Sequence, residues 1–254
     1  MQTAELLTQL KQDIDDVYAK SYTKGETKGE EQGYSRGYGE GQKAEYDKFW
    51  DAFQQNGERT NYYYAFVGGN YYGELIGGGW TDETFKPKYD MQPSIASRMF
   101  CDSAITDIVA SLERQGVTID FSKTKSFNDC LNGAISTTFP KIDMSSAANF
   151  HQGFRGASKL KSAHLVNIKQ TQHFYTAFES CADLENIILE GVVENGLDFH
   201  WSPKLTNESV QSIIGVLADL TDKTALTLTL HADVKANLTE EQIAQITSKN
   251  WTLA

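Results

Sequence analysis

Five histidines are the residues of this sequence that are best suited to acid–base catalysis or metal binding near neutral pH. They are spread through the second half of the chain without the carboxylate or cysteine pattern of a metal site, and neither H-E-x-x-H nor a phosphate-binding P-loop occurs. We therefore expect no catalytic residue, no metal and no cofactor, and a protein that is not an enzyme. The histidines are His151, His164, His173, His200 and His231.

Three cysteines are the other candidates for chemistry. Cys101, Cys130 and Cys181 are odd in number and far apart, which fits neither a disulfide framework nor a zinc site built from paired cysteines. The sequence therefore predicts buried free thiols.

A repeat of about 23 residues is the strongest pattern in the chain. Three segments align, IDFSKTKSFNDCL from Ile119, IDMSSAANFHQGF from Ile142 and VNIKQTQHFYTAF from Val166. In each, an aliphatic residue is followed eight positions later by Phe and four positions later again by Leu or Phe. Because one layer cannot bury its own apolar side, stacked layers should bury these positions as a continuous ladder. The predicted ladder is Phe100, Phe127, Leu131, Phe150, Phe154, Phe174 and Phe178.

This period predicts an α/β solenoid in the size class of short leucine-rich repeats. A helix beginning at Thr206, an alternating strand from Ala225, a helix capped by Thr239 and Gln242, and a last strand WTLA should form its C-terminal cap. The expected organisation is an amphipathic helix in 1–21, a glycine stalk or linker in 22–45, an aromatic-rich helix and hairpin as N-terminal cap in 46–94, repeats in 95–201 and the α/β cap in 202–254.

Two segments near the amino terminus predict an oligomer. Four aliphatic residues spaced 3, 4 and 3 apart form a short coiled-coil seam, although an amphipathic helix packed on its own protein has the same pattern. In YTKGETKGEEQGYSRGYGEG, glycine then stands at every fourth position. On a helix such a row allows close backbone approach, and a duplicated flexible linker is the alternative. The predicted oligomerisation residues are Leu7, Leu10, Ile14, Val17, Gly25, Gly29, Gly33 and Gly37.

Charge and hydropathy exclude several partners. The net charge is −11 without a basic run, so we expect no nucleic-acid partner. No apolar run approaches the ~20 residues of a membrane span, and the acidic amphipathic start lacks the pattern of a secretory signal. We therefore expect no signal peptide and no membrane insertion.

Tyrosines and tryptophan between positions 62 and 80 are candidates for ligand contact. Exposed rings could stack on sugars, whereas buried rings would seal the first repeat. Outward positions of the predicted strands are further candidates by geometry alone. The candidate ligand-binding residues are Tyr63, Tyr71, Trp80, Asp120 and Asp143.

The units MFCDSAITDI, GFRGASKLKSAHLV and AFESCADLENIILEG resemble BspA-like leucine-rich repeats. The C-terminal run from LTNESVQSII to KNWTLA, and GWTDETFKPKYD before the repeats, are similar to segments of repeat proteins encoded in phages and prophages of Gram-positive gut bacteria. The resemblance covers roughly residues 45–254.

This resemblance implies a non-enzymatic virion protein, assembled in the host cytoplasm, that displays a leucine-rich-repeat head from a helical stalk. It would be part of a phage tail, as a fibre, baseplate or receptor-binding component. The implied partners are copies of itself in a trimer or other small ring, other virion proteins bound through the N-terminal segment, and a host cell-surface glycan or protein. The alternatives are a bacterial surface adhesin of the BspA-like class and a capsid-attached head fibre or decoration protein.

Overall fold

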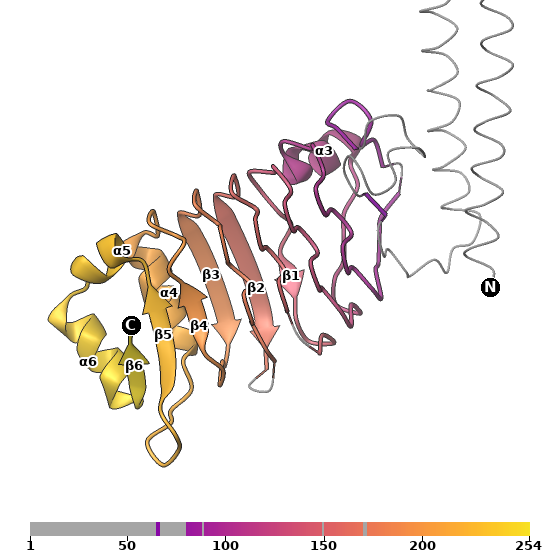
Figure 1. Cartoon of the computed structure of the whole chain (residues 1–254). Coiled ribbons are helices and arrows are strands. Elements are labelled where there is room, and N and C mark those ends of the chain that lie inside the picture. The colour runs from indigo at the N-terminus through magenta and orange to yellow at the C-terminus, as the bar shows by residue number, and fades with distance from the viewer. Residues whose placement is uncertain (1–64, 67–79, 88, 149, 170–171) are drawn as a thin grey trace, which may run out of the picture. The chain divides into compact units, whose positions relative to one another are not determined.

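The chain follows one short path several times, and each pass lies beside the previous one (Figure 1). The computed structural model describes residues 65–66, 80–87, 89–148, 150–169 and 172–254, all within one compact unit, Thr60–Ala254. The predicted amphipathic helix and glycine stalk lie outside the described residues. In chain order the described elements are α3 (Ile108–Gln115), β1 (Ile142–Asp143), β2 (Ser162–Ile168), β3 (Asn186–Gly191), β4 (Leu197–Phe199), α4 (Asn207–Val216), β5 (Leu226–Leu230), α5 (Ala232–Ala236), α6 (Glu240–Ser248) and β6 (Trp251–Leu253).

Two parallel sheets join successive passes. In the first sheet, of order β1-β2-β3, Ile142 pairs with Leu165 and Ser162 with Asn186, partners that are 23 and 24 residues apart. In the second, of order β4-β5-β6, Leu197 pairs with Leu228. The offsets in the first sheet equal the spacings between copies of the repeated sequence pattern.

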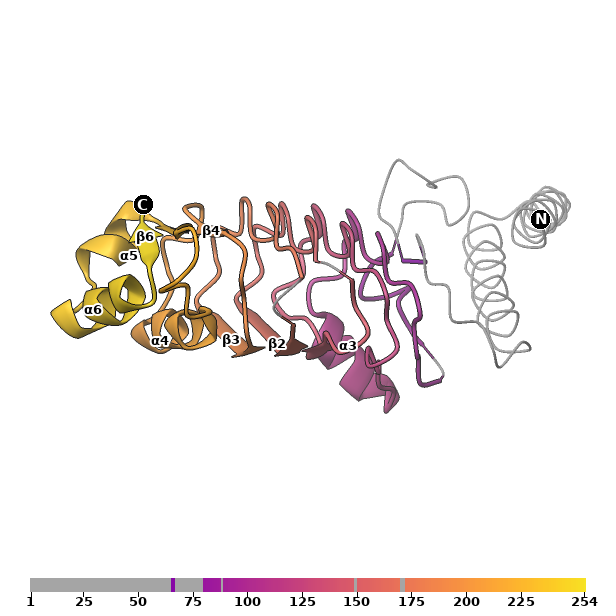
Figure 2. The same ribbon diagram turned by 90° about the horizontal axis from the view of Figure 1, so that it is seen from below.

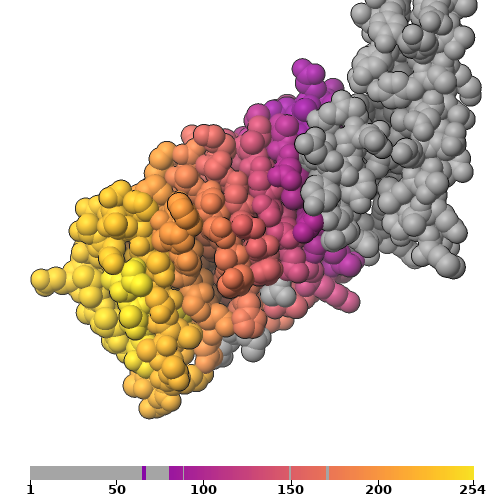
Figure 3. All heavy atoms as spheres, in the orientation of Figure 1, coloured from indigo at the N-terminus to yellow at the C-terminus, as the bar shows by residue number. Residues whose placement is uncertain are grey.

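The two sheets lie on different sides of the stack. Figure 2 shows α3, β2, β3 and α4 along one side, and β4 and β6 along the other. The colours of Figure 3 follow one another in chain order across the described surface, as expected when each layer contacts its sequence neighbours.

On the side of the stack that carries β4, the layers before β4 form turns. The backbone N–H groups of these turns alternate in direction. In the pass at 150–157 the even-numbered N–H groups donate to carbonyl oxygens of the next pass, whereas odd-numbered ones close turns within the pass. In the pass at 129–134 the two roles are exchanged. For residues 150, 152, 154 and 156 the acceptors are the carbonyls of residues 173, 175, 177 and 179. For residues 153, 155 and 157 the acceptors are the carbonyls of residues 150, 152 and 154. Every second donor therefore binds one layer to the next, and each of the seven donors named here has a backbone acceptor.

The parallel pairing crosses both expected domain boundaries. Isolated bridges join Thr81 to Ala104 and Met91 to Ile119, and both cross position 95. At the other end, β4 lies in the predicted repeats and β5 in the predicted cap, yet they pair directly. The described part of the expected N-terminal cap and the strand β5 of the expected C-terminal cap are thus paired with the repeats as further layers of the same stack.

The C-terminal elements confirm the sequence predictions for this region. α4 begins after Thr206, whose side chain accepts from the Ser209 N–H, and β5 and β6 form where alternation predicted strands. α6 starts with the predicted capping box, in which Thr239 and Gln242 each accept the other's backbone N–H. The short helix α5 was not predicted.

The interior is a continuous row of phenylalanine rings. All seven residues of the predicted ladder are buried, with exposures of 4% or less. Each buried Phe contributes about 1.5–3 kcal/mol of transfer free energy relative to exposure. Ring-centroid distances along the row are 5.0 Å for Phe66–Phe100, 5.7 Å for Phe100–Phe139, 5.6 Å for Phe139–Phe154, 6.0 Å for Phe154–Phe178 and 4.6 Å for Phe178–Phe199.

Helix α4 covers the edge of the first sheet. β3 is the last strand of this sheet, so its outer N–H groups would have no strand partner. The Ser209 hydroxyl accepts from the Ile187 N–H at 2.9 Å, and the Ser212 hydroxyl accepts from the Leu189 N–H at 2.8 Å. Two serines one helical turn apart thus replace a neighbouring strand and end the sheet.

Gly191, at the end of β3, allows the sharp approach of β3 to β2. Its φ is +131°, and a Cβ at this position would lie 2.2 Å from the carbonyl oxygen of Ile168. Because this neighbour is backbone, a side chain cannot be accommodated by rotation. Gly215 of α4 is the opposite case, since a Cβ there would meet nothing within 4 Å.

We expect Gly191→Ala to lower the free energy of unfolding by at least about 2 kcal/mol, through strain and displaced strands. Gly215→Ala is the matched control and should raise it by up to about 1 kcal/mol, because Ala is the better helix former. Urea unfolding of both variants measures the difference. Equal stability of the two would contradict the close approach at Gly191.

Candidate binding surface

Several predicted site residues fall outside the described part of the chain. They include the whole oligomerisation set and two of the aromatic ligand candidates. These residues are Leu7, Leu10, Ile14, Val17, Gly25, Gly29, Gly33, Gly37, Tyr63 and Tyr71.

Trp80 is not available to a ligand, so its assignment as a ligand-binding residue is wrong. Its ring is 1% exposed and packs edge-on against Phe66 at 5.4 Å and Phe85 at 6.3 Å between centroids. A large apolar ring gains more by covering the first described layer than it would by remaining in water. Its surroundings match the sealing alternative for this aromatic segment.

Asp120 and Asp143 lie at equivalent turns in successive layers. Each carboxylate accepts the backbone N–H two residues on, Ser122 and Ser145 respectively, which is an Asx turn. Each also accepts an amide N–H from a neighbouring layer, Gln92 for Asp120 at 2.6 Å and Asn167 for Asp143 at 3.0 Å. These contacts give both residues a role in turn formation and layer stacking, which lowers their suitability as ligand contacts.

The three cysteines are free and buried, as predicted. Burial raises the pKa of Cys181 to about 12. Burial, with the nearby Asp102 carboxylate second, raises the pKa of Cys101 to about 12, and burial also raises that of Cys130. Because a nucleophilic cysteine needs a lowered pKa and access to solvent, these thiols act as small core residues.

Charged side chains pair from layer to layer along the surface. Arg155 lies 3.3 Å from Glu179, and Asp183 lies between Lys159 at 3.5 Å and Lys204 at 2.6 Å. The hydrogen bond from Lys204 lowers the pKa of Asp183, and the same contact raises that of Lys204. Because such exposed pairs are screened by water, they add little to stability, and they mainly balance the charges on these sides of the stack.

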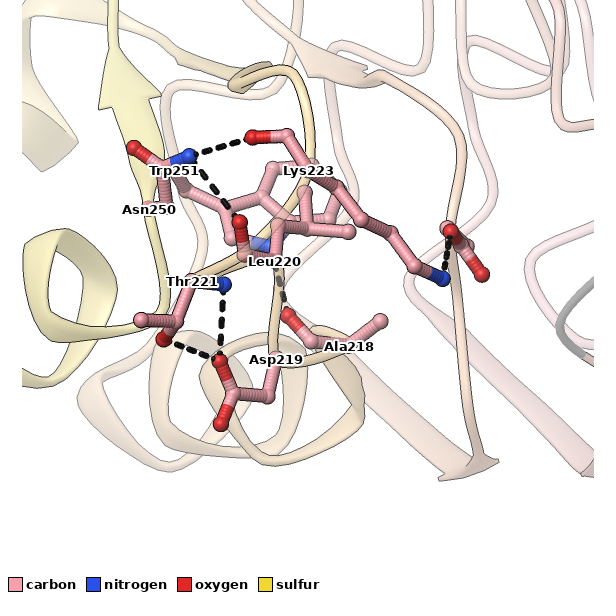
Figure 4. Close-up of polar contacts among 8 residues, drawn as sticks. Ala218, Asp219, Leu220, Thr221, Lys223, Asn250 and Trp251 are labelled. Atoms are coloured by element: carbon pink, nitrogen blue, oxygen red, sulfur yellow. Dashed lines mark hydrogen bonds and ion pairs between the residues drawn. The ribbon is translucent and has the colours of Figure 1, made fainter.

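The loop between α4 and β5 is closed by a small network of polar contacts (Figure 4). The Asp219 carboxylate accepts the backbone N–H of Thr221 at 3.0 Å and its hydroxyl at 2.5 Å. The Asn250 amide donates to the carbonyl oxygens of Leu220 and Lys223, and the Trp251 indole donates to that of Ala218. The residues between α6 and β6, with the first residue of β6, thereby hold this loop in place.

Exposed aromatic rings remain on the side that carries the turns and the second sheet. Tyr175 is 68% exposed and stacks on His151 at 5.3 Å. Trp201 is 50% exposed, and its ring lies 4.6 Å from that of His200. His200 Nδ1 is in turn 2.6 Å from Asp198 Oδ1. With Tyr89, which is 55% exposed, Tyr175 and Trp201 are the large aromatic side chains exposed on the described surface, and none of the three was expected from sequence.

Their position carried no clear signal in the sequence. The stretches HFY at 173–175 and HW at 200–201 do not by themselves show which side chains point outward, and only the burial of Phe174 and Phe199 does. Asp198, His200 and Trp201 follow the repeat in the degenerate last copy, where the pattern is weakest.

One match to a catalytic sequence motif occurs in the chain. Residues 33–37 read GYSRG, which fits G-x-S-x-G, the serine turn of α/β-hydrolases when a strand precedes it and a helix follows. Its two glycines belong to the four-residue glycine repeat, which accounts for their spacing. The segment lies outside the described residues.

Membrane-spanning helices and metal-binding clusters are both absent from the described residues. None of the helices there combines the length and the apolar character needed to cross a membrane. In the same residues, no three histidine, cysteine or acidic side chains come together in a way that could hold a metal ion.

Comparisons with known proteins do not add a function. No family model, no curated protein and no solved structure matches the chain.

Acid should weaken the turns that are closed by aspartate. Hydrogen bonds from the backbone N–H and hydroxyl of Thr118 lower the pKa of Asp90. Hydrogen bonds from the backbone N–H and hydroxyl of Ser122 lower the pKa of Asp120 in the same way. The hydroxyl and backbone N–H of Thr221 lower the pKa of Asp219. A lowered pKa stabilises the folded chain at pH values above the ordinary aspartate pKa of about 4. This stabilisation is lost as the pH falls through the lower pKa of the folded state.

We therefore expect Asp219→Asn to destabilise the protein near neutral pH and to become indistinguishable from wild type in acid. The midpoint of thermal unfolding, followed from about pH 6 to about pH 2, measures this. Asp222→Asn is the matched control, because Asp222 lies in the same loop and accepts no hydrogen bond within the described residues. A difference between wild type and Asp219→Asn that is constant with pH would contradict the expectation.

Proposed function

We propose that the chain is a non-enzymatic structural and binding protein of a phage virion, with a leucine-rich-repeat solenoid as its binding head. The single observation that carries this proposal is the stacking of parallel passes at offsets of 23 and 24 residues, the same period as the sequence repeat. Stacked layers of this kind form a long, rigid surface that suits recognition better than catalysis.

Three further features support a binding role over a catalytic one. The described histidines make at most single contacts with carboxylates, such as His164 with Glu190 at 2.9 Å. The cysteines are buried with raised pKa values. The last layers expose one large aromatic ring, Trp201, and exposed aromatic rings are typical of surfaces that bind sugars or proteins.

The assignment to a virion rests on the resemblance of the repeats and of the flanking segments to phage and prophage proteins. Within this proposal the N-terminal segment attaches to other virion proteins and forms the homo-oligomer, and the repeats contact a host cell-surface glycan or protein. A tail fibre, baseplate or receptor-binding component is the leading position. A head fibre or decoration protein would use the same parts on the capsid.

Antibody labelling of particles tests the location. An antibody against residues 80–254 should label purified phage particles, seen by electron microscopy, at a fixed place on the tail. The same antibody should leave washed walls of uninfected cells that carry the gene unlabelled. Label on cell walls and never on particles would reject the virion proposal in favour of a surface adhesin.

The mass of the full chain in solution tests the stalk. We expect a small closed ring, such as a trimer, by light scattering coupled to gel filtration. Substituting Gly29, Gly33 and Gly37 by Ala should weaken assembly if the glycines form a close-packed helical face, because each added Cβ separates the helices. Unchanged assembly with higher helix content would instead identify the segment as a flexible linker.

A further inference from the structure

Trp201 lies at an unusual place for a large aromatic residue. It follows β4 in the turn Phe199–Ser202, is 50% exposed, and its indole N–H has no hydrogen-bond partner within the described residues. Trp80 and Trp251, by contrast, are 1% and 3% exposed, and the Trp251 N–H donates to the Ala218 carbonyl. Trp201 thus offers both an apolar ring and a free donor to solvent.

A fixed polar pair stands beside this ring. Asp198 Oδ1 accepts both the backbone N–H of His200 at 2.9 Å and its Nδ1–H at 2.6 Å. With Nδ1 occupied by Asp198, Nε2 is the ring nitrogen that remains for a ligand, and Asp198 Oδ2 is a carboxylate acceptor beside it. Because the His200 ring also contacts the Trp201 ring at 4.6 Å, the three groups are held in one cluster.

The second sheet makes this cluster part of a wider polar surface. Leu197 and Phe199 of β4 are buried, so Asp198 between them faces outward. Asp198 pairs with Thr229 of β5, and Thr227 of β5 pairs with Thr252 of β6. Partners in a parallel sheet share a face, so the threonine hydroxyls extend the surface away from Trp201 as alternating donors and acceptors.

We infer that Trp201, His200 and Asp198 form a site for a neutral saccharide, which rests on the proposed binding function and gives it a location. The apolar face of a pyranose stacks on the indole ring, while its hydroxyl groups bond to the Trp201 N–H, His200 Nε2 and Asp198 Oδ2. A flat apolar ring beside hydrogen-bond donors and acceptors is the combination that a sugar requires. The free carboxylate oxygen and the net charge of −11 disfavour polyanionic polymers.

Fluorine NMR of the full chain labelled with 5-fluorotryptophan tests the site. The chain has four tryptophans, so Trp201 gives one resonance of its own, which Trp201→Phe identifies by its loss. Chitotetraose and cellotetraose are the probes, with oligogalacturonate as the anionic comparison. We expect a neutral probe to shift the Trp201 resonance in a saturable manner and to leave the buried Trp80 and Trp251 resonances in place.

Variants then separate the groups in the site. Trp201→Ala should lower the association constant at least about tenfold, and Trp201→Phe should lower it less because the ring is retained. Asp198→Asn should also weaken binding, since it removes the charge that fixes His200. Tyr175→Ala is the matched control, because it removes another exposed ring that also contacts a histidine, and it should bind as wild type does. Unchanged thermal unfolding of each variant excludes loss of the fold.

The outcomes distinguish this inference from the proposed function. If neither neutral probe shifts the Trp201 resonance, or if Trp201→Ala binds as tightly as wild type, the site is wrong. Preference for oligogalacturonate would likewise reject a neutral ligand. Binding of the wild-type chain to host cells, measured in the same preparation, decides whether the proposed binding function survives such a result, because it does not depend on which residues make the contact.

Discussion

The alternating direction of backbone N–H groups is the constraint on which the described structure depends. In the turn side of each layer, one N–H closes a turn within the layer and the next one reaches the adjacent layer. A segment of this kind can satisfy its donors only when another copy of the same path lies beside it. The fold is therefore built by adding one layer after another, and each layer supplies the hydrogen-bond acceptors that the previous layer needs.

The phenylalanine ladder follows from this constraint. Hydrogen bonds at fixed offsets place equivalent side chains above one another, so rings such as Phe150 and Phe174 meet at 5.9 Å. Where Leu131 replaces a phenylalanine, Phe139 lies between Phe100 and Phe154, at 5.7 and 5.6 Å from their centroids. The core thus keeps aromatic contact across a layer whose own repeat position is smaller, and the backbone register sets where such a substitute has to stand.

Sequence reasoning located the parts of the structure that spacing controls. Phe127, Phe150 and Phe174 are buried at the predicted interval, and the capping box at Thr239 is present. It could not locate features that arise from contact between layers. Thr176 adopts a φ of +48°, which no propensity of a β-branched residue would suggest and which the bonds to the neighbouring layer impose. Trp80 is a similar case, because an aromatic residue is equally suited to a sugar and to a core until its neighbours are known.

The same reasoning explains why the proposed site lies late in the stack. In the regular layers, outward carboxylates and amides such as Asp143 and Asn167 bond to one another from layer to layer, which leaves few of them for a ligand. The copy that contains Asp198 departs from the pattern, and β4 pairs with β5 at a longer offset than the strands of the first sheet. There the Asp198 carboxylate bonds to His200 within its own layer, so the two side chains and the adjacent Trp201 are released from the stacking contacts that occupy their counterparts elsewhere. Departure from the repeat is thus the physical condition under which a stacked protein can present specific groups to a partner.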